Sequence, residues 1–189
     1  MKTPKELLEA YVQAKDGNQP ALMADIYAPD AVLTFSNETD TIAFPARTEG
    51  ADGIEEVLVR DLRSRFDHVK TWYVCDAAPP DGKDIAILPW LVIMQQMSNG
   101  ALRIGKGYYR WSFASYASAT QVTAMHIHIE RMDVIEDHDG KKREALQAAL
   151  AYPWLRPVAM HESFRDLMRQ HSTLAFLRDF LEPVGRAAR

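Results

Sequence analysis

One stretch of the chain, residues 7–35, constrains the fold more than any other. Its apolar residues recur at steps of three and four, stop at the turn sequence around Gly17, and recur again over residues 22–27. This spacing predicts two short helices, each with one buried face. Pro29 is expected to end the second helix, because proline cannot donate to the helix ladder, and residues 31–35 predict a strand. Two helices that lead into a strand form the lid and one wall of a cup.

The rest of residues 1–138 predicts one more helix and a sheet. Thr3, with Glu6 three residues later, indicates a capped start for the first helix, and residues 54–66 carry the apolar spacing of a third helix. The strands are expected at residues 41–44, 68–75, 85–97, 102–113 and 121–135. Because the last four are long and joined by short turns, they predict a strongly curved antiparallel sheet. With helices before strands, the fold class is α+β.

Residues 139–189 predict a helical extension that packs on the same domain. Apolar stripes indicate helices at residues 141–151, 161–170 and 173–181. The sequence alone assigns no job to these helices.

Composition excludes several classes of protein. The apolar share of 47% is ample for a buried core, and the net charge of −4 comes from intermixed acids and bases, which argues against nucleic-acid binding. No apolar run approaches the roughly 20 residues that span a bilayer, and the first residues lack the apolar core of a signal peptide. Cys75 is the only cysteine. An intrachain disulfide is therefore impossible, and a cytoplasmic location is expected.

The order of these elements resembles the NTF2-like superfamily, which includes SnoaL-like cyclases, ketosteroid isomerases and scytalone dehydratases. The stretch AYVQAKDGNQPALMADIYAPDAVLTF looks like the opening of a ketosteroid isomerase, and QVTAMHIHIERMDV looks like the last strand of the superfamily. The resemblance covers about residues 5–136. It implies a cone in which a curved sheet wraps around N-terminal helices, and a homodimer that forms through the outer face of the sheet.

The resemblance also implies roles for single residues. The phenol that donates to an oxyanion in the isomerase falls on Tyr11, and the second, protonated carboxyl donor falls near Tyr109. The carboxylate base falls on Phe35, which cannot take up a proton, and the scytalone dehydratase aspartate falls near Val12. Because a phenol is kept and the base is lost, steroid isomerisation by that mechanism is not expected.

With Phe35 facing inward, the alternation of strand side chains predicts the lining of the cup. The inward set is mostly apolar and aromatic, as is typical of a small-ligand pocket. It consists of Leu33, Phe35, Trp90, Val92, Met94, Gln96, Arg103, Tyr109, Trp111, Phe113, Met125, Ile127 and Ile129. Substrate contacts are expected from Phe35, Trp90, Met94, Gln96, Arg103, Trp111, Met125 and Ile127.

The last strand carries His126, His128 and Glu130 on one face, which this register makes the outer face. Two histidines at i and i+2 could share a metal ion with the carboxylate, or His128 could serve as a general base. Alternatively, the histidines could lie in a dimer interface or under the C-terminal helices. A slip of one residue would turn them inward. His128 is the candidate base, and no metal site is assigned.

Two functions follow from these residues, with a metal site on His126 and His128 as a third hypothesis. In the first, a SnoaL-like enzyme of the isomerase, cyclase or dehydratase type acts on a hydrophobic, carbonyl-bearing molecule that Tyr11 and Tyr109 polarise. In the second, a non-catalytic module binds an apolar ligand or holds a partner, because no clear acid or base faces inward. No organic cofactor is expected, since there is no glycine-rich phosphate loop.

Overall fold

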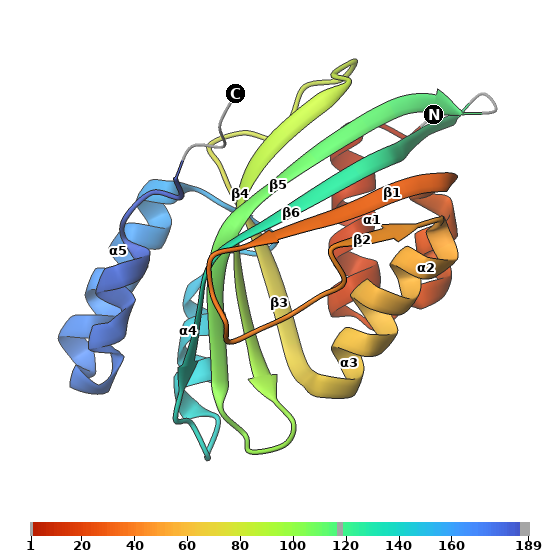
Figure 1. Cartoon of the computed structure of the whole chain (residues 1–189). Helices are drawn as coiled ribbons and strands as arrows, with labels where there is room; N and C mark the ends of the chain where they lie inside the picture. Colours follow the sequence, from red (N-terminus) through yellow and green to blue (C-terminus); the bar gives the residue numbers. More distant parts are fainter. Residues whose placement is uncertain (1, 117–118, 186–189) are drawn as a thin grey trace.

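The computed structural model describes residues 2–116 and 119–185. It shows one curved sheet with N-terminal helices on one side and C-terminal helices on the other (Figure 1). The fold class is therefore α+β, as predicted. The strands are β1 (Tyr27–Asn37), β2 (Arg47–Glu49), β3 (Phe66–Val74), β4 (Ile85–Gln96), β5 (Leu102–Tyr116), β6 (Ala119–Ile135) and β7 (Trp154–Leu155).

The strands lie in the order β2-β1-β6-β5-β4-β3-β7. From β3 to β6 they pair with antiparallel neighbours, as the sequence predicts. Toward its two ends the sheet also contains parallel pairs, of β1 with β6 and of β7 with β3. Parallel neighbours need a long connection between them in the chain. The segment from β2 to β5 connects β1 to β6, and the segment from β4 to α4 connects β3 to β7.

The first helix, α1 (Pro4–Asp16), begins as predicted. The Thr3 hydroxyl accepts from the Glu6 backbone N–H, and the Glu6 carboxylate accepts from the Thr3 N–H. Leu8 and Tyr11 are fully buried on the face that packs against the sheet. This face forms one wall of the cup.

The α-helix predicted at residues 22–27 is a 3-10 helix, η1 (Pro20–Asp25). It ends early because Tyr27 already pairs with Val122 in the sheet, so its six residues close with the tighter bonds of 3-10 turns. The first strand therefore begins at Tyr27. Pro29 lies within it at a shift of register, where a residue without an N–H is tolerated.

The third helix starts earlier than predicted and changes type along its length. It runs as α2 (Ala51–Glu55), a π-helical segment η2 (Glu56–Asp61) and α3 (Leu62–Arg65). Wide turns of this kind are rare and are often found at functional sites. Here the segment carries Leu58, which together with Leu62 faces the concave side of the sheet.

The short strand predicted at residues 41–44 does not form. The Ile42 carbonyl accepts from the Asn37 side-chain amide, and the Thr41 carbonyl accepts from the Arg103 guanidinium. Side chains thus take the place of a neighbouring strand as partners for these carbonyls. The segment is irregular up to β2, and Ile42 and Phe44 in it face the concave side of the sheet.

The C-terminal extension consists of α4 (Lys141–Ala149), α5 (Pro157–Gln170) and a 3-10 helix, η3 (Ser172–Phe180), with β7 between α4 and α5. It packs on the outer face of the sheet (Figure 1) in a second apolar cluster. The sheet side of this cluster consists of Trp72, Leu91, Ile93, Leu102 and Ile104. None of the helices in the described part of the chain is long and apolar enough to cross a membrane.

Polar contacts hold the end of the extension in place. Lys106, which is buried on the outer face, donates to the carbonyls of Asp179 and Glu182 at 3.2 and 3.0 Å and pairs with Glu130 at 3.2 Å. Glu130 also accepts from the Gly185 N–H. The extension therefore covers the part of the outer face formed by β3, β4 and the start of β5. A homodimer through the outer face remains a prediction, and it would have to use the part of that face beyond the extension.

Candidate functional site

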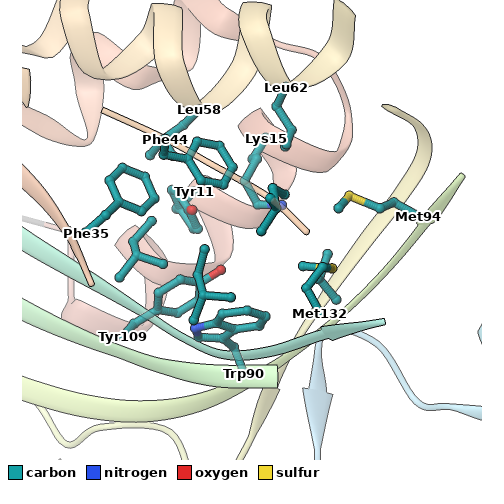
Figure 2. A pocket seen from close by; sticks show the side chains of 14 residues that line it. Tyr11, Lys15, Phe35, Phe44, Leu58, Leu62, Trp90, Met94, Tyr109 and Met132 are labelled. Carbon is teal, nitrogen blue, oxygen red and sulfur yellow. The ribbon is translucent and has the colours of Figure 1, made fainter. Parts of the chain in front are cut away.

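The concave face of the sheet and the helices opposite enclose a cavity of about 50 Å³ (Figure 2). The structure places many of the residues predicted to face inward around it: Tyr11, Phe35, Trp90, Val92, Met94, Tyr109, Ile127 and Ile129. The other lining residues are Lys15, Ile42, Phe44, Leu58, Leu62 and Met132. The lining is thus apolar except for two phenols, one indole N–H and one amine.

Two stacked rings border this cavity. Phe35 of β1 and Phe44 of the irregular segment lie 4.7 Å apart at an interplanar angle of 5°, and both are half-buried. The open space is well below the roughly 300–1,000 Å³ of typical small-molecule sites. A ligand larger than a few atoms therefore requires side chains such as Phe44 to move.

Two residues predicted to contact substrate lie behind the lining instead. Trp111 is fully buried and packs edge-on against Tyr11, with ring centroids 5.0 Å apart. Met125 is 1% exposed, and its sulfur accepts from the Tyr27 hydroxyl at 3.0 Å. Both side chains face inward as predicted, but nearer the base of the cup, where the core is filled.

Tyr11 and Tyr109 meet at the floor of the cavity, with ring centroids 5.9 Å apart in an edge-on arrangement. Burial raises the pKa of Tyr11, and the nearby Tyr109 adds to that shift; burial also raises the pKa of Tyr109. Both phenols therefore stay protonated and act as donors. Among the described residues, the Tyr11 hydroxyl and the Trp90 Nε1–H have no hydrogen-bond partner.

Lys15 is the charged residue of the lining that the sequence analysis missed. It follows Tyr11 by one helical turn, so the two side chains share a face of α1. Its amine donates to the Asp16 carboxylate at 2.8 Å and to the Thr71 hydroxyl at 2.6 Å. Asp16 also accepts from the Tyr152 hydroxyl at 2.9 Å, which ties the extension to this corner of the cup.

His126 and His128 lie on the outer face, as the predicted register requires. Ser36 Oγ lies 2.8 Å from His126 Nε2 and 2.7 Å from His128 Nδ1, and the Thr34 hydroxyl lies 2.8 Å from His126 Nδ1. Burial lowers the pKa of His126, and the electrostatic influence of the neighbouring His128 and Arg110 lowers it further.

The strand backbone separates His128 from the cavity. The expectation that His128 acts as a base on a ligand in the cup therefore does not fit the structure. Residues 2–116 and 119–185 contain no group of three or more His, Cys, Asp or Glu that could hold a metal ion. The hypothesis of a metal held by both histidines and Glu130 also lacks support, because Glu130 is paired with Lys106.

Comparison with solved structures identifies the class of fold. The chain is similar to an NTF2-like superfamily protein from Salmonella enterica serovar Typhimurium, with a TM-score of 0.53 and 15% identity over 65% of this chain and 84% of that one. It is similar to hexachlorocyclohexane dehydrochlorinase LinA-type3 from Novosphingobium barchaimii, with a TM-score of 0.55 and 11% identity over 69% and 86%. It is also similar to a ketosteroid isomerase-like protein from Erwinia carotovora atroseptica, with a TM-score of 0.53 and 13% identity over 68% and 95%.

The chain therefore has an NTF2-like fold, as the resemblance predicts. The sequence itself matches no family model and no curated protein. At these identities the likeness shows the fold alone. The function of the cup depends on the side chains that line it, not on the fold.

Proposed function

We propose that the cup binds a small, largely apolar molecule through a hydrogen-bond acceptor such as a carbonyl oxygen. The buried Tyr11 hydroxyl carries this proposal, because it lines the cavity and has no partner among the described residues. A buried donor left unpaired costs about 1–3 kcal/mol, so a ligand that supplies the acceptor recovers that free energy. Trp90 Nε1–H lines the same space as a second unpaired donor.

A catalytic version of this function is an isomerase, cyclase or dehydratase of the SnoaL-like type. The solved structures with this fold include a dehydrochlorinase and a ketosteroid isomerase-like protein, which supports the general class. Tyr11 and Tyr109 would donate to a carbonyl oxygen and stabilise the negative charge that develops on it in an enolate. Their raised pKa values keep the protons available for that task.

Such a reaction also needs a group that moves a proton. Besides the two phenols, Lys15 is the only titratable side chain that residues 2–116 and 119–185 contribute to the lining. Its contacts with Asp16 and Thr71 leave one amine hydrogen that Lys15 can donate to a ligand. Lys15 is therefore the proton-transfer group of the catalytic version.

The second candidate is a non-catalytic module that carries an apolar ligand. One observation favours it: within the described part of the chain, the lining contains no Asp, Glu or His. In this module Tyr11 contributes to ligand affinity, and Lys15 transfers no proton.

Titration calorimetry with a panel of small ketones tests the binding function. The aryl ketone butyrophenone, paired with butylbenzene, isolates the contribution of the carbonyl. We expect the ketone to bind more tightly than the hydrocarbon, and Tyr11→Phe to remove most of that difference. If no ketone of the panel binds, or if Tyr11→Phe binds them equally well, the proposal is wrong.

Hydrogen–deuterium exchange separates the two versions. A catalytic cup speeds the exchange of the hydrogens beside the ketone carbonyl in D₂O, which NMR follows directly. Lys15→Met would abolish that acceleration and leave ketone affinity nearly unchanged. Binding without accelerated exchange would identify the module.

A further inference from the structure

A second hollow, of about 360 Å³, begins where the cup ends. Ile42 lines both spaces. Arg103 lines the hollow and pairs across the strands with Met94, which lines the cup. Because cross-strand partners point to the same face of a sheet, Arg103 continues the inner face of the cup toward the hairpin between β4 and β5. The two spaces are therefore neighbours along one surface.

Arg103 is buried in this position without a counter-charge. The residue is 8% exposed, and one guanidinium nitrogen donates to the Thr41 carbonyl at 2.8 Å. The remaining two nitrogens, Nε and Nη1, have no hydrogen-bond partner among the described residues. A buried cation whose donors are unpaired is unfavourable unless an acceptor is supplied.

A second guanidinium adds to the positive charge. Arg65 also lines the hollow, and both arginines lie over the Phe66 ring, at 5.4 and 5.7 Å from its centroid. In the described residues, no carboxylate oxygen lies within 4.0 Å of either guanidinium; the arginines that form ion pairs are others. Asp40 is the acid of the lining, and it is exposed and pairs with neither arginine.

The rest of the hollow provides neutral polar groups. Thr41, Ser64 and Ser98 contribute hydroxyls, and Gln96 contributes an amide. Gln96 already donates to the Ser98 hydroxyl at 2.9 Å. Gln96 and Arg103 were both predicted to bind substrate. The structure places them here, beyond the apolar cavity.

We propose that Arg103, assisted by Arg65, binds a carboxylate on the same molecule whose apolar body occupies the cup. This inference rests on the proposed function and narrows it to a class of ligand, the small apolar keto acids. A guanidinium presents its N–H groups in a planar fork that matches the two oxygens of a carboxylate. The carboxylate would satisfy the unpaired donors of Arg103 and offset the repulsion between the two cations.

Matched ligands test this assignment. Butyrophenone and β-benzoylpropionate have the same aryl ketone and differ by a terminal methyl or carboxylate group. Because Tyr109 and Arg103 are six residues apart on β5, roughly 20 Å along the strand, the series extends to ω-benzoyl acids with longer methylene chains, each paired with the alkyl ketone of the same length. Calorimetry on the full-length protein should show the best keto acid binding at least about tenfold more tightly than its ketone. Arg103→Gln should bring that ratio close to one while ketone affinity stays the same. Arg65→Gln should lower the ratio by less.

Three further variants control for charge and folding. Arg103→Lys keeps the charge but not the fork, and should retain only part of the preference. Arg63→Gln removes a guanidinium that pairs with Asp67 outside the hollow and should leave the ratio unchanged. Asp40→Asn removes the acid of the lining and should leave keto-acid affinity unchanged or higher.

The outcomes separate this inference from the proposed function. If ketones and keto acids bind equally to the wild type, or if Arg103→Gln keeps the preference, the carboxylate site is refuted and the cup remains. If inorganic phosphate or acetate competes for the keto acid but not for the ketone, the anion site is supported independently. If neither series binds, both proposals are refuted.

Discussion

Both faces of the sheet carry an apolar cluster, but the outer cluster is filled by side chains and the concave one contains a cavity. The outer face is covered by the protein's own extension, whose helices fill the space over Trp72 and Leu91. The concave face keeps a cavity. Of the seven buried side-chain atoms without a partner in the described residues, five lie on the concave side, on Tyr11, Trp90, Arg103 and Trp111.

This difference indicates that the two faces serve different purposes. Unpaired buried donors and open space lower stability, whereas a covered apolar face raises it. The extension thus supplies stability on one side, while the other side retains unpaired donors on Tyr11 and Trp90 that line the cavity and that a ligand could satisfy.

The largest effect is expected on the outer face. Phe164 of α5 is fully buried among the sheet residues of the second cluster. Phe164→Ala should lower the free energy of unfolding by about 3–5 kcal/mol, as for other large-to-small core changes, with ketone affinity preserved in the folded protein. Urea denaturation measures the loss. Val158→Ala, on the same helix and 56% exposed, should change stability little, and an equal loss in both variants would contradict the account.

The next largest effect on stability is expected at the end of α1, where Asp16 accepts from Tyr152 of the extension. Asp16 and Lys15 form a buried pair, with side-chain exposures of 4% and 5%. Asp16→Asn keeps the shape but leaves the Lys15 charge uncompensated, and should cost about 2–3 kcal/mol. Adding Lys15→Met should restore part of the stability in thermal melts. A double variant as unstable as the sum of both single changes would show that the pair is not coupled.

A small effect on stability is expected at the floor of the cup. Tyr11→Phe should raise the free energy of unfolding, by about 1 kcal/mol, because it removes a buried donor that has no partner to lose. Tyr73 is the matched control, since its buried hydroxyl donates to the Leu8 carbonyl at 2.9 Å. Tyr73→Phe should cost about 1–2 kcal/mol. Equal losses would mean that the Tyr11 hydroxyl is structural.

The smallest effect is a change of stability with pH, at His126 on the part of the outer face that the extension does not cover. The pKa of His126 is lowered by burial and by nearby positive charge, so the unfolded chain binds a proton more readily than the folded one. Its contribution to stability is therefore present above about pH 6.5 and is lost as the pH falls below that value. Urea denaturation between about pH 7.5 and 5.5 should show the decline, and His126→Gln should reduce it. An unchanged slope would contradict this assignment.

The sequence predicts the elements of the cup well. The capped start at Thr3 and the strand alternation around Trp90 and Ile127 depend on residues a few positions apart in the chain. Such local spacing can be recognised directly in the sequence. The resemblance assigns roles to Tyr11 and Tyr109 but none to Lys15, although Lys15 follows Tyr11 by one turn on the same face of α1. The helical wheel of α1 would have placed it beside Tyr11.

Other features could not be read from local pattern. Whether an inward residue lines open space or packed core depends on which distant side chains reach it. Trp111 and Arg103 are both inward positions of β5 by strand alternation, but Trp111 lies in the packed core and Arg103 lines the second hollow. The 3-10 form of η1 and the strand β7 depend on pairing with distant segments. The extension could be predicted as helices, but its position over the outer face depends on contacts between residues far apart in the chain.

The most direct test of the central claim is the infrared carbonyl stretch of butyrophenone, labelled with ¹³C at the carbonyl, when it is bound to the protein. Tyr11 as a buried donor predicts that the stretch of the bound ketone shifts to lower frequency than in an apolar solvent, and that Tyr11→Phe reverses the shift. A bound ketone with the same frequency in both proteins would show that the acceptor does not meet Tyr11, and would contradict the account.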